Sequence, residues 1–350
     1  SSAGRRRARC ACGTVGIRKR CRSRSPAPPP NPSTWSRCAS VSARSVAPYE
    51  SPLRPTPRRS SPSRSPLPSI DTPRAAVLDK DALPAKYATV DGSHVHYLHS
   101  GPTTLPDVPP ALDRGRLFLL VHAAGSNAGM WQPQFAAAAE EHSVVALDFP
   151  GHGRSSGVEG LPTIDAYAES LVHFADAVRL RPFVLVGRSM GGAVAMTVAA
   201  RHPERLAGLV LVCTGARFPL EPAHLTTLRD VVRGRLPQQF TTETFSPSTP
   251  VALMREAWMQ QVKTDPRVRY ADLLACQAFD GDALLPRIRT PTLVVAGADD
   301  QVTPPALSEE LARGIAGARL EIVSEAGHQA PLEQADRFNR LVANFAETLR

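Results

Sequence analysis

The chain lacks the features that mark membrane proteins and disulfide-stabilised secreted proteins. Its longest apolar runs, among them 117–121 and 209–213, are far shorter than the roughly 18 residues that a membrane-spanning helix requires. Only six cysteines occur, with no CxxC pair and no spacing typical of zinc ligands. We therefore expect no membrane partner, no disulfide framework and no metal site, and the cysteines fit a reducing compartment such as the cytoplasm.

Acidic residues are almost absent from residues 1–70, which contain 15 arginines and lysines but a single acid, Glu50. Residues 71–350 contain 26 basic and 31 acidic side chains, so the net charge of +9 originates in the N-terminal segment. A basic protein invites a nucleic-acid interpretation. Because the positive excess is confined to residues 1–70, we expect no nucleic acid to bind the folded domain.

Residues 1–70 are also poor in aromatic side chains and rich in proline and serine, which predicts a disordered tail. Three interpretations of this tail are open. Its composition is typical of an organellar transit peptide, which would place the protein in an organelle. The first methionine is Met130, so the tail can instead be translated upstream sequence that the native protein lacks. The third interpretation is a polyanion-binding arm.

From residue 87 onward, apolar strand patterns alternate with helical patterns. Residues 87–99 predict a hairpin turning at Asp91-Gly92, and we interpret its histidines (His94, His96 and His99) as polar decoration of an edge strand. The alternation predicts an α/β fold: a mostly parallel central sheet with helices on both faces. The expected strands cover 116–121, 143–147, 183–186, 206–212, 292–296 and 319–323, and the expected helices cover 130–141, 163–180, 190–201, 305–315 and 332–349.

Residues 217–289 interrupt this alternation with helical patterns and no strand pattern. The expected helices cover 221–232, 250–262 and 268–279. A segment of this length is too long for a plain connection. We therefore expect a helical cap at residues 217–289, inserted into a core formed by residues 71–216 and 290–350.

A G-x-S-x-G motif at residues 187–191 lies between a predicted strand and a predicted helix. In that context the motif predicts a nucleophile elbow, in which flanking glycines allow the strand and helix to close tightly around a strained serine. Ser189 is therefore the candidate nucleophile. The helix that follows directs its N-terminal dipole toward developing negative charge.

A serine needs a base, and the base needs an orienting acid. The elbow arrangement predicts the chain order serine, acid, histidine. His328 follows the last predicted strand and is the candidate base. The candidate acid is Asp299 or Asp300, because both follow the preceding strand at the sheet edge where the elbow also lies.

These segments together resemble the α/β-hydrolase superfamily from about residue 87 to residue 350. The resemblance implies that Asp300 is the acid and that the backbone N–H groups of Ala124 and Met190 form the oxyanion hole. Ala123 departs from the family, which usually has glycine there, and this puts the geometry of the turn in question. The matching motifs are HAAG at 122–125, DFPGHGRS at 148–155, GRSMGG at 187–192, GADD at 297–300 with Pro304, and GH at 327–328 with Glu333.

The resemblance further implies a serine hydrolase that forms an acyl-enzyme on a small-molecule ester or lactone, its expected partner, without any metal or organic cofactor. Serine as nucleophile argues against the dehalogenase and epoxide-hydrolase branches. The motifs are most similar to enol-lactonases and esterases. Alternatives are a carbon–carbon hydrolase of aromatic degradation, a cofactor-free haloperoxidase or perhydrolase, a small-molecule receptor with vestigial hydrolysis, and a binding protein driven by its tail.

Apolar residues of the cap are candidates for the substrate pocket, namely Met254, Trp258 and Phe279. The same residues can instead form the core of the cap. Arg188, inside the elbow, is a candidate anion anchor. In relatives the side chain at this position usually packs beside the site.

Overall fold

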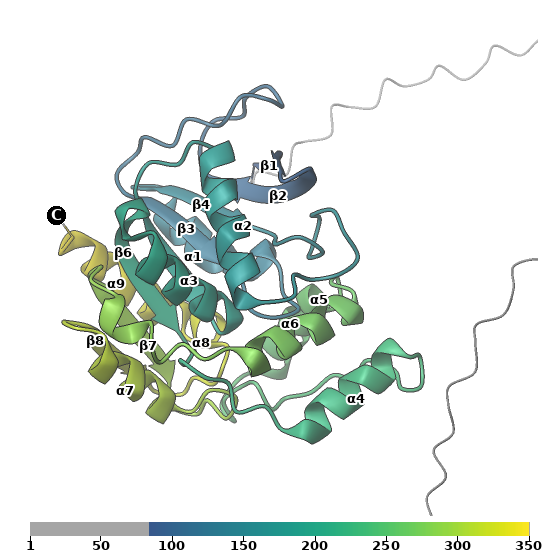
Figure 1. Cartoon of the computed structure of the whole chain (residues 1–350). Helices are drawn as coiled ribbons and strands as arrows, with labels where there is room; N and C mark the ends of the chain where they lie inside the picture. Colours follow the sequence, from purple (N-terminus) through teal and green to yellow (C-terminus); the bar gives the residue numbers. More distant parts are fainter. Residues whose placement is uncertain (1–83, 350) are drawn as a thin grey trace, which may run out of the picture. The chain divides into compact units, whose positions relative to one another are not determined.

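The computed structural model describes residues 84–349, which contain an eight-stranded sheet (Figure 1). The expectations for residues 1–70 lie outside the described residues. The sheet order is β1-β2-β4-β3-β5-β6-β7-β8. The β1–β2 and β2–β4 pairs are antiparallel, whereas β4, β3, β5, β6, β7 and β8 run parallel to one another. The mostly parallel sheet is thus confirmed. The strands are β1 (Ala85–Val90), β2 (Ser93–His99), β3 (Leu117–Val121), β4 (Ser143–Leu147), β5 (Phe183–Arg188), β6 (Leu206–Val212), β7 (Thr292–Gly297) and β8 (Arg319–Val323).

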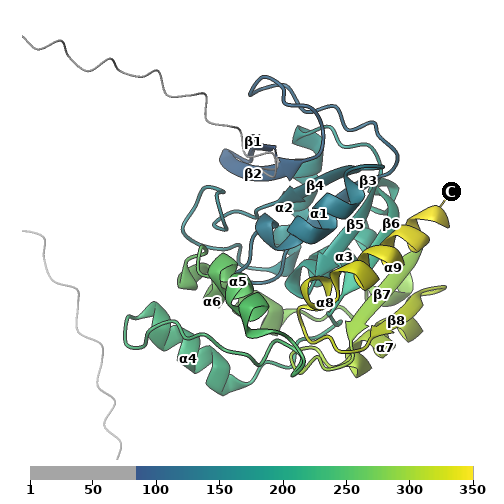
Figure 2. The same cartoon turned by 180° about the vertical axis from the view of Figure 1, so that it is seen from behind.

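Helices cover both faces of this sheet. Figure 1 shows α2, α3 and α7 in front of the strands, and Figure 2 shows α1 and α9 covering the opposite face. Alternate residues of β3 enter two separate cores, since Leu119 packs with the first set of helices and Leu120 with the second. This double burial explains the unbroken apolar runs in the sequence. The helices are α1 (Gln132–Ala138), α2 (Ile164–Ala177), α3 (Met190–Arg201), α7 (Pro305–Gly314) and α9 (Ala335–Glu347).

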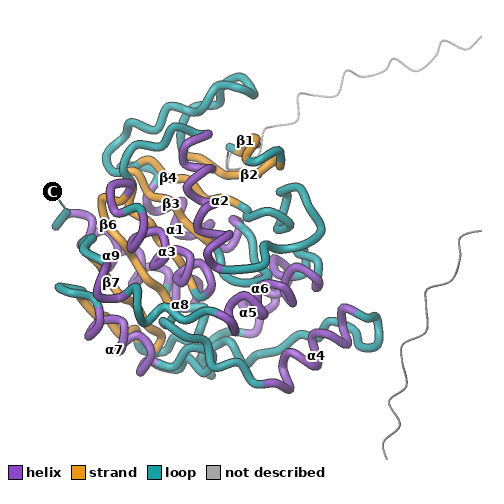
Figure 3. The backbone as a smooth tube through the Cα atoms, viewed as in Figure 1, coloured by secondary structure: helices purple, strands orange, loops and turns teal. Residues whose placement is uncertain are grey.

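Between β6 and β7 the chain forms α4 (Pro222–Val232), α5 (Val251–Gln261) and α6 (Pro266–Ala278), and no strand. Figure 3 shows these helices on one side of the sheet, with a long loop between α4 and α5 and a short connection between α5 and α6. They match the helices expected at residues 217–289. No helix within residues 84–349 has the length and apolarity needed to cross a membrane, and Cys213 and Cys276 are buried free thiols.

Two local expectations are wrong. The helix expected at 332–349 breaks at Gln334, whose backbone is non-helical (φ −129°, ψ 52°), into a short α8 (Ala330–Glu333) and α9. The histidines of β2 do not decorate an edge strand, because β2 lies between β1 and β4. His96 and His99 are buried, and His96 Nδ1 lies 2.8 Å from the Asp148 carboxylate. Across the described range, no cluster of three or more potential ligands could hold a metal ion.

Candidate active site

Ser189 occupies the sharp turn between β5 and α3, with φ 54° and ψ −120°. A positive φ is costly for a non-glycine residue, so the surrounding structure must enforce it. A Cβ at Gly187 would lie 2.2 Å from the carbonyl oxygen of Gly191, and a Cβ at Gly191 would lie 2.6 Å from that of Val121. Only glycine fits at both positions. The strand and helix therefore close tightly and present the Ser189 side chain beyond the end of β5.

His328 and Asp300 form a hydrogen-bonded pair, with 2.9 Å between Nδ1 and Oδ2. Burial raises the pKa of the Asp300 carboxyl, but the charge and hydrogen bond of His328, together with hydrogen bonds from Thr303, outweigh it and lower this pKa overall. The Thr303 N–H and hydroxyl donate at 2.9 and 2.8 Å. Because a carboxylate only accepts, Nδ1 of His328 carries the proton, and its Nε2 keeps a lone pair that can act as a base.

Asp299 points elsewhere. Its carboxylate accepts a hydrogen bond from the Ser246 hydroxyl at 2.6 Å, and its N–H donates to the carbonyl of Ala326. Of the two acids that the sequence left as alternatives, the fold brings Asp300 to His328.

Glu333 fixes the loop that carries His328. Its carboxylate accepts from the N–H groups of Gly327 and Gln329, each at 3.0 Å. It also accepts from the N–H of Ser246 at 2.8 Å and from the Thr249 hydroxyl at 2.6 Å. These bonds hold the loop before and after His328 in place.

The turn at residues 122–125 presents the second half of a potential oxyanion hole. Within residues 84–349, neither the N–H of Ala124 nor that of Met190 donates a hydrogen bond. Both groups are therefore available to an incoming oxyanion. The residue of this turn that needs a positive φ is Gly125 (φ 62°), whereas Ala123 does not. An alanine at position 123 is thus compatible with the turn.

His122 supports this turn as a neutral imidazole. It is fully buried, and burial together with the charge of His152 lowers its pKa to about 4. Its Nε2 accepts from the N–H of Phe149 at 3.1 Å, so Nδ1 carries the proton and donates to the carbonyl of Ala123 at 2.9 Å. The imidazole therefore ties the turn to the loop that begins at Asp148.

A buried carboxylate that the sequence analysis missed holds the same turn from α6. Asp272 accepts hydrogen bonds from the N–H of Gly125 and from His152 Nε2, both at 2.7 Å, and from the Tyr167 hydroxyl. Burial opposes its charge, but His152 and the hydrogen bonds outweigh it, so the pKa of Asp272 is lowered and that of His152 is raised. No local motif marks Asp272, whose partners are more than 100 residues away in sequence.

The loop that begins at Asp148 has the supporting role that its motif implies. The buried Asp148 carboxylate accepts from the N–H groups of Ala128 and Arg154, at 2.6 and 2.9 Å, and from His96. These bonds link the loop to β2 and to the helical turn that follows residues 122–125.

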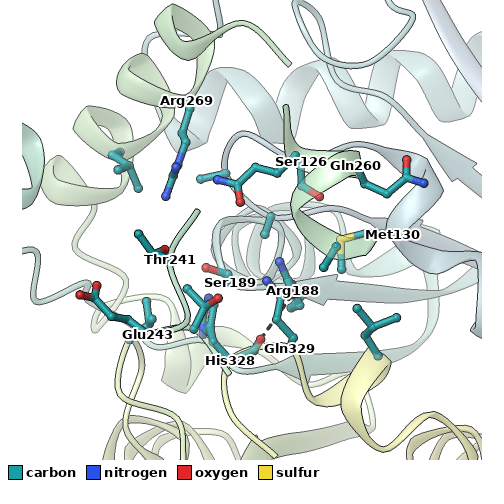
Figure 4. Close-up of a pocket in the computed structure, with 18 of the residues that line it drawn as sticks. Ser126, Met130, Arg188, Ser189, Thr241, Glu243, Gln260, Arg269, His328 and Gln329 are labelled. Atoms are coloured by element: carbon teal, nitrogen blue, oxygen red, sulfur yellow. Dashed lines mark hydrogen bonds between the residues drawn. The ribbon is translucent and has the colours of Figure 1, made fainter. Parts of the chain in front are cut away.

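These features meet at a cavity of about 840 Å³. Figure 4 shows Ser189, His328 and Arg188 at its floor, with Gln260 and Arg269 projecting from α5 and α6. Ala124 also lines the cavity, as do residues of α5 and α6. A volume of this size suits a small organic molecule.

The three cap residues predicted to line the pocket do not line this cavity. Helix α5 instead presents Ala257 and Gln260, with Glu256 and Gln261 beside them. Trp258 lies about 100° further around the helix than Ala257, and its ring packs edge-on against Phe240 at 6.1 Å between centroids. Met254 is buried, and Phe279 packs against Phe218 and the main core. All three residues therefore serve packing.

Comparisons with known proteins place this architecture among hydrolases. Residues 118–341 match the model of the alpha/beta hydrolase family. A protein of Rhizobium rhizogenes named "Putative carbamate hydrolase RutD" is 30% identical over 251 residues, 67% of this chain and 94% of the relative. A 2-hydroxy-6-oxononadienedioate/2-hydroxy-6-oxononatrienedioate hydrolase of Pseudomonas sp is 28% identical over 217 residues, 58% of this chain and 77% of the relative. The crystal structure of an enol-lactonase from Burkholderia xenovorans superposes with a TM-score of 0.62 at 29% identity, covering 74% of this chain and 98% of the other.

Proposed function

Because the chain belongs to the alpha/beta hydrolase family, we propose that it hydrolyses a small carboxylic ester or lactone through an acyl-enzyme on Ser189. The observation that carries this proposal is the meeting of the elbow serine and the Asp300–His328 pair at one cavity. The free N–H groups of Ala124 and Met190 support it, because an acyl transfer develops negative charge on the carbonyl oxygen.

The first step is acylation. Ser189 Oγ attacks the carbonyl carbon while His328 Nε2 takes the hydroxyl proton, and Asp300 stabilises the imidazolium that forms. The N–H groups of Ala124 and Met190 donate to the tetrahedral oxyanion. When the intermediate collapses, the carbon–oxygen bond to the leaving group breaks, and His328 returns the proton to the departing alcohol.

The second step is deacylation. Water gives a proton to His328 Nε2 as it attacks the acyl carbon, and the same oxyanion donors act again. As the bond to Ser189 Oγ breaks, His328 gives this proton to Oγ, which releases the carboxylic acid and restores the serine hydroxyl. In a lactone the leaving alcohol stays attached to the acyl group, so water opens the ring and yields a single hydroxy acid.

A fluorophosphonate probe and a panel of short esters and lactones test this proposal together. The probe should label the protein once, and Ser189→Ala should remove both the labelling and the turnover. Labelling that survives Ser189→Ala would refute the nucleophile assignment. The exposed Ser248 is a matched control, because Ser248→Ala removes a hydroxyl from the loop between α4 and α5 and does not alter a residue that lines the cavity.

Carbamate hydrolysis is the second candidate, favoured by the relative from Rhizobium rhizogenes that carries this name. The same serine would attack a carbamate carbonyl, and the products would include ammonia or an amine. Adding alkyl carbamates to the panel and measuring amine release separates the two candidates. A higher kcat/KM for a carbamate than for the ester of matched size would replace the ester proposal.

A further inference from the structure

Arg188 places a positive charge beside the nucleophile. It is the last residue of β5, directly before Ser189. Arg188 is only 4% exposed, which is similar to the exposure of Ser189 (8%) and His328 (5%). All three residues line the same cavity, and Figure 4 shows Arg188 next to Ser189 with a hydrogen bond to Gln329. The guanidinium therefore lies at the depth where a scissile carbonyl must bind.

Within residues 84–349 this guanidinium has only neutral partners. Its Nη1 donates to the carbonyl of His328 at 3.3 Å and to the side-chain oxygen of Gln329, whereas Nε and Nη2 donate to nothing. Two carboxylates, Asp300 and Glu333, lie close enough for their charges to act on it, but neither contacts it. Asp300 bonds to His328, and Glu333 bonds to the loop backbone.

An unpaired buried charge is costly, because water is removed and no counter-ion replaces it. Burial lowers the pKa of Arg188 to about 10, which still leaves the guanidinium charged at neutral pH. Within residues 84–349 no carboxylate contacts this guanidinium, so its charge lies at the cavity floor without a paired counter-ion, where the low dielectric strengthens electrostatic attraction.

Acidic side chains also line the cavity, but they lie at its rim. Glu221, Glu243 and Glu256 are all exposed, so water and salt screen their charges. Arg188 is buried at the floor, where screening is weak. The charged side chain that lines the cavity directly beside Ser189 is therefore Arg188.

We propose that Arg188 binds a carboxylate of the substrate, so that the preferred substrate is an ester or lactone with a carboxylate near its scissile carbonyl. This inference rests on the proposed function, since it specifies the substrate of the same site. Nη2 has no protein partner within residues 84–349, and a guanidinium N–H forms a strong charge-assisted hydrogen bond to a carboxylate oxygen. Binding the carboxylate would supply the missing counter-ion.

Esters matched in acyl length test the preference. The monomethyl esters of succinic, glutaric and adipic acid carry a free carboxylate, and the methyl esters of butyric, valeric and hexanoic acid are their neutral counterparts. We expect at least one carboxylate ester to exceed its neutral counterpart in kcat/KM by roughly 10- to 100-fold, the worth of a charge-assisted hydrogen bond. Equal or lower kcat/KM values for all three carboxylate esters would overturn the inference.

Variants of Arg188 test the assignment itself. Arg188→Met should lower the ratio of kcat/KM for the preferred carboxylate ester to that for its neutral counterpart by the same 10- to 100-fold, mainly through KM. Arg188→Lys should recover part of the ratio. Arg313→Met is the matched control, because Arg313 is exposed on α7 and lies away from the cavity. An unchanged ratio in Arg188→Met, with both rates and the melting temperature lowered alike, would show that Arg188 only supports the loop and would overturn the inference.

A binding measurement separates this inference from the proposed function. The Ser189→Ala protein should bind free glutarate in calorimetry more tightly than the neutral diamide of glutaric acid, at constant ionic strength, and Arg188→Met in that background should abolish the difference. If wild-type protein hydrolyses no ester but this binding difference is present, the proposed function fails and the anion site stands. If neutral esters are hydrolysed but the difference is absent, the inference on Arg188 fails alone.

Discussion

Two of the buried Asp–His pairs within residues 84–349, Asp300–His328 and Asp272–His152, have similar geometry and different surroundings. In the pair Asp300–His328 one imidazole nitrogen bonds to the carboxylate at 2.9 Å, and the histidine lines the cavity. In the pair Asp272–His152 the corresponding distance is 2.7 Å, but both side chains are fully buried, and the second nitrogen of His152 lies 3.1 Å from the carbonyl of Pro150. The first histidine therefore keeps a lone pair facing the cavity, whereas both nitrogens of the second are occupied.

This difference shows that residue types and distances do not define a catalytic pair. A base must have a nitrogen without a protein partner and access to the substrate. His328 meets both conditions, and His152 meets neither. The pair Asp272–His152, here called the sealed pair because water cannot reach it, instead connects α6 to the turn at 122–125. It positions the backbone, whereas the accessible pair, Asp300–His328, can transfer a proton.

A substitution that disrupts the accessible pair, Asp300–His328, should reduce catalysis most. Asp300→Asn should lower kcat on the preferred ester by roughly 10⁴-fold, because an amide favours the wrong tautomer of His328. The melting temperature should stay close to that of the wild-type protein, because the substitution changes the tautomer of His328 and not the packing. Steady-state kinetics and thermal unfolding measure both. Asp299→Asn is the matched control and should cost less than about tenfold, the scale of a single hydrogen bond. The reverse order would transfer the orienting role to Asp299.

Breaking the sealed pair should affect stability first. Asp272→Asn leaves His152 buried without its counter-ion, which costs about 3–5 kcal/mol of unfolding free energy. In a domain of this size the melting temperature should fall by about 10 °C. Phosphonate labelling of Ser189 should slow in the folded variant, because the Gly125 N–H loses its charged acceptor. Asp280→Asn, at an exposed acid after α6, should change neither. A normal melting temperature in Asp272→Asn would contradict the role of this pair.

The shifted pKa values of His122 and His152 together predict a pH dependence of stability. His122, whose folded pKa is about 4 against about 6.5 when unfolded, contributes stability above pH 6.5 that is lost as the pH falls toward 4. His152, whose folded pKa is raised, contributes stability below pH 6.5 that is lost as the pH rises through its folded pKa. The melting temperature should therefore peak near pH 6.5. His122→Gln should reduce the acid slope and His152→Gln the alkaline slope, and a flat profile from pH 5 to 9 would refute the assignment.

The smallest changes in activity are expected at two neighbouring residues of α5. Ala257 lines the cavity, whereas Trp258 packs against Phe240. Trp258→Ala should lower the melting temperature by a few degrees and leave the ester chain-length profile unchanged. Ala257→Phe should shift the profile toward shorter acyl groups by a graded 10- to 100-fold, because each methylene of fit is worth only ~1–3 kcal/mol. An ester series on both variants measures the contrast. A shifted profile in Trp258→Ala would restore this residue to the pocket.

Features that depend on short stretches of chain could be predicted from the amino-acid sequence. Strands buried on both faces require unbroken apolar runs, and the elbow at Ser189 requires glycines at fixed offsets. Both requirements are local and therefore visible as patterns. The alternation of strands and helices predicted the sheet for the same reason. The break at Gln334 escaped because the apolar periodicity continues through it.

Which distant groups meet could not be predicted, because it depends on the packing of the whole fold. Asp299 and Asp300 are adjacent in sequence and chemically identical, and the turn after β7 sends one toward His328 and the other toward Ser246. Asp272 bonds to residues 120 and 147 positions away, and Trp258 faces away from the cavity that Ala257 lines. Such pairings depend on how whole elements pack, and packing leaves no periodic trace in a single sequence.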